Sequence, residues 1–160
     1  MLKLTASACI DAPVERVWGV LSELTAIQYW VGAIQHSYCP GQQRGVGAVR
    51  ICELRQARIE ETILEWNEGH SFKYRGVGAP MIATATNSWS VAAHGDQTLV
   101  TSVAEATLKG GVLGRALELL AKPMFARLGA QSLASLKYYV EQGKPFAGRT
   151  RDLVPAPGAC

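Results

Sequence analysis

The segment GVGAVRICELRQARIEETILEW, residues 45–66, contains two strand-like runs separated only by Arg55-Gln56. So short a connection joins antiparallel strands, because parallel strands need a crossover of a dozen residues or more. With a two-residue turn at this point, Arg50 lies opposite Glu61 on a face that is otherwise apolar. The segment therefore predicts a hairpin whose inner face carries one ion pair.

The period-two pattern of this hairpin extends along the chain in both directions. Short connections join the runs from residue 46 onward, which is typical of an antiparallel meander. The predicted strands lie at about 2–10, 46–54, 57–66, 71–77, 83–93 and 98–108.

Two further hairpins extend the polar pair into a row. A turn at residues 67–69 predicts Tyr74 beside Glu61, and a turn near Pro80 predicts Asn87 opposite Tyr74. The predicted inner face is therefore a polar row, Arg50, Glu61, Tyr74 and Asn87, bordered by the apolar residues Ile59, Ile63, Phe72, Trp89 and Val91.

This row has two interpretations. An Arg–Glu pair with a Tyr hydroxyl and an Asn amide satisfies the requirement that a buried charge be paired and hydrogen-bonded, so a structural role is favoured. The alternative is that the same groups also contact a ligand: Arg50 an anionic or carbonyl oxygen, Glu61 a proton, and Tyr74 and Asn87 a polar head group.

The sequence leaves two alternatives for the face of the last strand, 98–108, that points inward. One face carries the small residues Val100, Ser102, Ala104 and Ala106, and the other carries Leu99, Val103 and Glu105. We favour the small residues inward, because they leave room for a ligand opposite Trp89 and because an inward Glu105 has no evident partner.

Helical spacing flanks the strands. Asp11-Ala12-Pro13 begins a helix, a second short helix covers about residues 24–29, and residues 112–142 form a long amphipathic helix that Pro123 should kink or split. This order predicts an α+β fold, a domain at 1–143 and a tail at 144–160. The predicted lid over the sheet consists of Leu117, Leu120, Met124 and Leu128.

Composition excludes several classes of protein. The 160 residues are 48% hydrophobic, and 16 Lys and Arg against 13 Asp and Glu give a net charge of +3. This balance lacks the basic footprint of a nucleic-acid-binding protein. No apolar run is long enough to cross a bilayer and no signal segment is evident, so we expect a cytoplasmic protein without integral membrane association.

The cysteines and histidines predict no metal site and no cofactor. Cys9, Cys39, Cys52 and Cys160 show no metal-binding or redox spacing, so we expect reduced thiols. His36, His70 and His94 lie far apart on different elements.

Three segments carry a resemblance to a known family: IDAPVERVWGVLSELTAIQYWVGAI at 10–34, GVGAVRICEL at 45–54 and RIEETILEWNEGHSFKY at 58–74. Together with the order of elements, they resemble the START-like (SRPBCC) superfamily, and in particular its polyketide cyclase/dehydratase-like members. This resemblance implies a helix-grip fold, in which a curved antiparallel sheet wraps around the long C-terminal helix. It also implies an internal cavity for a hydrophobic or amphipathic small molecule.

We therefore expect a protein that binds a lipid, quinone or polyketide-like molecule in this cavity. One alternative is a metal-free cyclase or dehydratase, with Glu61 and Tyr74 transferring protons and Arg50 stabilising an oxyanion. A second is a protein-interaction module, and a homodimer stays open. The expected ligand-binding residues are Arg50, Glu61, Phe72, Tyr74, Asn87, Trp89, Ser102, Leu120 and Met124.

Overall fold

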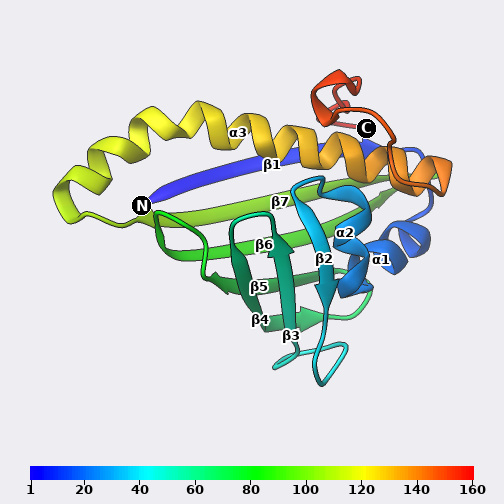
Figure 1. Ribbon diagram of the computed structural model, residues 1–160. Coiled ribbons are helices and arrows are strands. Elements are labelled where there is room, and N and C mark those ends of the chain that lie inside the picture. Colours follow the sequence, from blue (N-terminus) through cyan, green and yellow to red (C-terminus); the bar gives the residue numbers. More distant parts are fainter.

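The computed structural model describes residues 1–160 and contains one curved sheet, a long helix and several short helices (Figure 1). The elements, in chain order, are β1 (Leu2–Ile10), α1 (Val14–Ser22), η1 (Leu24–Ala26), α2 (Ile27–Trp30), β2 (Ile34–Tyr38), β3 (Val49–Leu54), β4 (Arg58–Asn67), β5 (Ser71–Val77), β6 (Ile82–His94), β7 (Gln97–Leu108), α3 (Gly111–Gln142) and η2 (Thr150–Asp152). No helix combines the length and the hydropathy that crossing a bilayer requires.

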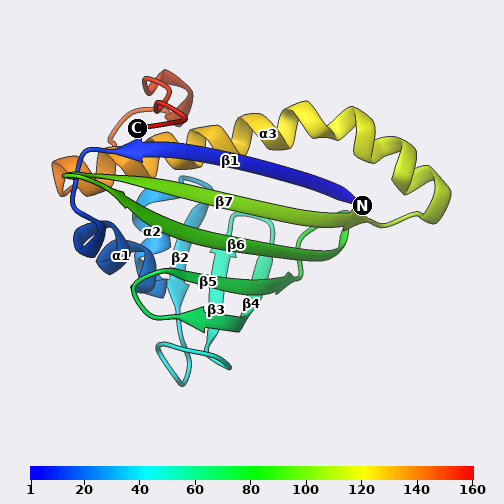
Figure 2. The same ribbon diagram turned by 180° about the vertical axis from the view of Figure 1, so that it is seen from behind.

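The seven strands form one antiparallel sheet in the order β1-β7-β6-β5-β4-β3-β2. The predicted fold class is confirmed, with one strand more than expected. The additional strand, β2, is short and pairs with β3 at the edge of the sheet. Figures 1 and 2 show α3 running alongside β1, with α1 and α2 at the end of the sheet where the C-terminal half of α3 lies.

The core lies under the C-terminal half of α3. Leu133, Leu136 and Val140 of α3 are at most 2% exposed and belong to the same buried cluster as Trp18 of α1 and Trp89 of β6. The space between the sheet and the C-terminal half of α3 is therefore filled by side chains. Of the two expectations for Pro123, a kink or a split, the split is wrong, because the helix is continuous through this residue.

The N-terminal half of α3 does not form the predicted lid. Leu120 is 76% exposed, and Leu117, Met124 and Leu128 are also exposed. The reason is the rotation of the helix about its axis, because α3 buries the face that carries Gly114 and Glu118. The predicted lid residues lie roughly 100° around the helix from that face. A Cβ on Gly114 would lie 2.6 Å from the Lys109 carbonyl oxygen. Glycine at this position therefore allows the first turn of α3 to pack closely against the backbone that follows β7.

The predicted strand registers are right at two hairpins and displaced at the third. Arg50 pairs with Glu61, and Tyr74 pairs with Asn87, as expected. Between β4 and β5, however, Glu61 lies opposite Gly76 instead of Tyr74. The turn occupies residues 68–70, and a bulge after Ile63 adds a residue to β4. The displacement is two residues, which leaves Glu61 and Tyr74 on the same face of the sheet.

The tail crosses α3 and returns to β1. Cys160 forms a disulfide with Cys9, and the Cys9 amide donates a hydrogen bond to the Pro157 carbonyl at 2.7 Å. The expectation of reduced thiols is therefore wrong for Cys9 and Cys160, whereas Cys39 and Cys52 are free. A separation of 151 residues left no spacing signal for this pairing.

Glu68, in the turn between β4 and β5, holds three elements together. Its carboxylate accepts hydrogen bonds from the indole nitrogens of Trp18 and Trp66, each at 2.8 Å, and forms an ion pair with Arg44. Arg44 first, and then the two indoles, lower the pKa of Glu68 from 4.5 to about 2. The charged form is therefore stabilised in the folded protein.

We expect an acid transition at this turn. A lowered carboxyl pKa stabilises the fold above pH 4.5, and this contribution is lost as the pH falls through about 2. Tryptophan fluorescence, followed with far-UV circular dichroism, should change in this window while secondary structure is retained. The Glu68→Gln variant should show no such transition. A wild-type transition centred near pH 4.5 would contradict the assignment.

Candidate functional site

Arg50 and Glu61 form a buried ion pair between β3 and β4. Arg50 is 2% exposed, and its Nε donates to Glu61 Oε2 at 2.6 Å. Its Nη1 donates to the Leu24 carbonyl oxygen at 3.0 Å, and its guanidinium lies 5.1 Å from the centre of the Tyr74 ring. Burial alone would lower the pKa of Arg50, but the adjacent Glu61 carboxylate raises it above its ordinary value. Arg50 is therefore charged, and its Nε and Nη1 donors already bind groups of the protein itself.

Glu61 has one oxygen committed to the fold and lines a cavity. Both hydrogen bonds that its carboxylate accepts, from Arg50 Nε and from Cys52 Sγ at 3.5 Å, are on Oε2. The Oε1 atom accepts none within the protein. A carboxylate can accept about four hydrogen bonds. Glu61 can therefore accept a further one from a ligand without losing its partner Arg50.

Tyr74 completes a chain of hydrogen bonds across three strands. Ser102 Oγ on β7 donates to Asn87 Oδ1 at 2.9 Å, and Asn87 Nδ2 on β6 donates to the Tyr74 hydroxyl oxygen at 3.3 Å. Burial, and next the charge of Glu61, raise the pKa of Tyr74 well above its ordinary value. The phenol therefore keeps its proton. Since its oxygen already accepts a bond from Asn87, that proton remains available to a partner.

Glu61, Tyr74 and Asn87 border a cavity between the sheet and α3. The cavity has a volume of about 220 Å³, and most of its wall is apolar. It is lined by Leu2, Leu4, Ile59, Glu61, Tyr74, Gly76, Ala79, Ile82, Ala85, Thr86, Asn87, Ala104, Glu105, Ala106 and Phe125. We call it the inner cavity. Its polar edge offers an acceptor on Glu61 and a donor on Tyr74, which together suit a hydroxyl group.

The structure brings together only part of the expected site. Glu61, Tyr74 and Asn87 line the inner cavity, and Ser102 lines a small neighbouring cavity of about 80 Å³. Arg50 lines none of the larger cavities and is enclosed in its ion pair, while Phe72 and Trp89 are buried in the core. Leu120 is exposed, and Met124 lines a different and larger cavity.

The last strand places its small residues at the inner cavity. Ala104 and Ala106 line it, and Val100 is fully buried. Glu105 also borders the cavity, but its carboxylate forms an ion pair with Lys3 at 2.9 Å. The Lys3 ammonium group lowers the pKa of Glu105 below its ordinary value.

Most residues of this wall, Gly76 and Phe125 among them, were not among the expected ligand-binding residues. Gly76 faces Glu61, and only the displaced register of β5 brings it there. Phe125 reaches the cavity from α3, because the face of α3 that turns to the sheet differs from the predicted one. The predicted apolar face of the helix, with Leu117, Leu120, Met124 and Leu128, did not include Phe125.

No group of three or more His, Cys, Asp or Glu side chains is placed to hold a metal ion.

Comparisons with known proteins agree with this geometry. The sequence matches the family model described as polyketide cyclase/dehydrase and lipid transport over residues 1–141. A search of the curated proteins gave no match.

Several solved structures share the fold. They include the XoxI protein from Bacillus cereus (TM-score 0.72, 18% identity, covering 88% of this chain and 96% of that one) and a START superfamily protein from Mycobacterium smegmatis (0.70, 14%, 89% and 99%). A third is the di-domain aromatase/cyclase BexL of the BE-7585A biosynthetic pathway (0.71, 16%, 88% of this chain and 47% of that one). The family-model match spans most of the chain, and it shows that this protein belongs to the polyketide cyclase/dehydrase and lipid transport family.

Proposed function

We propose that the protein binds a small hydrophobic or aromatic molecule bearing one hydroxyl group in the inner cavity, and that it does so without changing the molecule. The observation that carries this proposal is the polar edge of the cavity. Glu61 offers an unused acceptor and Tyr74 an unused donor in a mostly apolar wall. An apolar pocket with a few placed polar groups is the usual form of a small-molecule site.

A cyclase or dehydratase is the second candidate, favoured by the family description and by the aromatase/cyclase among the similar structures. Glu61 would accept a proton and Tyr74 would return one. The expected oxyanion role of Arg50 has less support, because its Nε and Nη1 already donate to Glu61 and Leu24. A protein-interaction module has less support still, because the inner cavity is not filled by side chains.

Native mass spectrometry of the purified protein, followed by release of any bound molecule, is the first test. We expect a co-purifying hydroxylated lipid, quinone or aromatic molecule of unchanged chemical structure. Conversion of a small polyketide-like carbonyl compound by the wild type, lost in Glu61→Gln, would instead establish the enzyme.

The Tyr74→Phe variant tests the hydroxyl assignment. We expect it to bind 2-naphthol about 2- to 10-fold more weakly than the wild type, because one net hydrogen bond is lost. Naphthalene, which has the same rings and no hydroxyl, should bind both proteins equally. The measurement is a fluorescence titration. An equal loss for both compounds would place the effect in packing and refute the donor role of Tyr74.

The cytoplasmic location remains part of the proposal. Disulfides persist mainly in oxidising compartments. Trapping of thiols with an alkylating reagent during lysis, followed by mass analysis of the peptides that contain Cys9 and Cys160, tests it: the reduced form supports the cytoplasm and the disulfide opposes it.

A further inference from the structure

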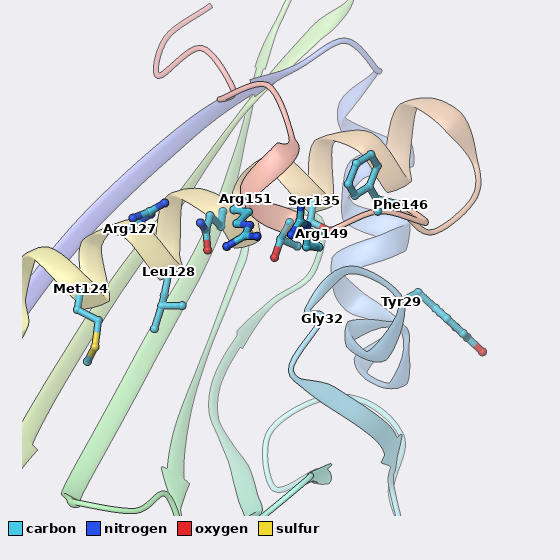
Figure 3. A pocket seen from close by; sticks show the side chains of 12 residues that line it. Tyr29, Gly32, Met124, Arg127, Leu128, Ser135, Phe146, Arg149 and Arg151 are labelled. Atoms are coloured by element: carbon cyan, nitrogen blue, oxygen red, sulfur yellow. The ribbon is translucent and has the colours of Figure 1, made fainter.

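A second and larger cavity lies outside the inner cavity, between the middle of α3, the loop after α2 and the tail. It has a volume of about 740 Å³. Its wall consists of Tyr29, Gly32, Met124, Arg127, Leu128, Gln131, Ser135, Phe146, Gly148, Arg149, Thr150 and Arg151 (Figure 3). We call it the outer cavity. It contains three arginines and no acidic residue.

The three arginines have few partners within the protein. Arg149 forms an ion pair with Asp152 at 3.1 Å. Arg127 and Arg151 take part in none of the salt bridges of the structure. All three line the outer cavity, Arg127 from α3 and Arg149 and Arg151 from the tail (Figure 3). Like charges gathered in this way repel one another, and an anion placed between them removes the repulsion.

The other wall of the outer cavity is apolar. Met124 and Leu128 extend from the same side of α3, and both are exposed (Figure 3). They continue an exposed stripe that begins at Leu117 and Leu120. From Leu117 to Leu128 the stripe extends about 16 Å along the helix axis at the usual rise per residue. It is a surface for an extended apolar chain, with cations at one end.

Two of the three arginines come from the tail. Arg149 and Arg151 flank Thr150 in η2, and the tail is tied to β1 by the Cys9–Cys160 disulfide and by the hydrogen bond between the Cys9 amide and the Pro157 carbonyl. The tail therefore forms one wall of the cavity, and its attachment holds these two charges in place.

We propose that the outer cavity binds the carboxylate or phosphate of an amphipathic ligand whose apolar body lies along Met124 and Leu128. Arginine suits this task, because its planar fork donates two hydrogen bonds to a carboxylate or phosphate. The proposal goes beyond the proposed function, because it assigns a second site and an anionic class of ligand, and its test uses ligands other than 2-naphthol.

The test is calorimetric titration with decanoate, decyl phosphate and decan-1-ol, which share one chain and differ in the head group. The Arg127→Gln/Arg151→Gln variant should bind both anions at least about tenfold more weakly, because charge-assisted hydrogen bonds are lost. Its affinity for decan-1-ol should be unchanged. The control, Arg75→Gln/Arg115→Gln, removes the same charge from exposed positions and should bind all three as the wild type does.

Tail attachment provides an independent readout. The Cys160→Ser variant should lose affinity for the anions and keep its affinity for decan-1-ol, since it releases the wall that carries Arg149 and Arg151.

Four results would overturn the proposal. They are wild-type protein that binds neither anion, an arginine variant that binds the anions normally, a loss equal for anions and alcohol, and a control variant that loses as much as the test variant. Normal 2-naphthol binding in the same samples would show that the proposed function survives. The preferred anion, decanoate or decyl phosphate, distinguishes a fatty-acid-like from a phosphate-bearing ligand.

Discussion

Replacing Arg50 by Met is expected to lower the free energy of unfolding by about 3–5 kcal/mol, because it leaves the Glu61 carboxylate without its counterion in a buried site. Glu61 is 8% exposed, and its Oε2 would keep only the weak bond from Cys52. The Leu24 carbonyl would also lose its donor. Met has a similar length and fills most of the volume, so the lost charge, and not a cavity, dominates the effect. Urea denaturation measures it.

The double variant Arg50→Met/Glu61→Gln provides the control. It removes the unpaired charge together with the arginine, so we expect it to be clearly more stable than Arg50→Met alone. Together with the single variant Glu61→Gln, it completes a double-mutant cycle that measures the coupling of the two side chains. Additive losses in the single and double variants would mean that the pair does not interact and would contradict the 2.6 Å contact.

The sequence predicted those parts of the fold that depend on neighbouring residues. Arg55-Gln56 leaves room for only one hairpin, so the Arg50–Glu61 pairing followed directly from the turn. The β4–β5 hairpin has a three-residue turn and a bulge, which alternation does not reveal. Its register was therefore wrong by two residues. The predicted face of the sheet was nevertheless right, because side chains on a strand alternate with a period of two and a shift of two residues leaves them on the same face.

Features set by distant contacts were not predictable. The apolar stripe of α3 suggested a lid, but its orientation depends on the packing of Gly114 and Glu118 against the end of the sheet. In the same way, Cys160 meets Cys9 only because the tail folds back across α3. The site followed this division: Glu61, Tyr74 and Asn87 came from local register, whereas the arginines of the outer cavity came from tertiary structure.

Ala104→Leu is expected to abolish most binding in the inner cavity while leaving the fold intact. Ala104 lies on β7 between Leu4 and Asn87, and it lines both the inner cavity and its 80 Å³ neighbour. A leucine there would enter existing empty space, so the unfolding midpoint should change little.

A ligand competing for that space should bind about 10- to 100-fold more weakly, the equivalent of the 1–3 kcal/mol that overpacking a filled site costs. Titration with 2-naphthol measures this loss. Ala92→Leu adds the same group at an exposed position of β6 and should bind like the wild type. If Ala104→Leu binds 2-naphthol with wild-type affinity, the ligand lies elsewhere. In that case the polar edge formed by Glu61 and Tyr74 serves the stability of the sheet alone.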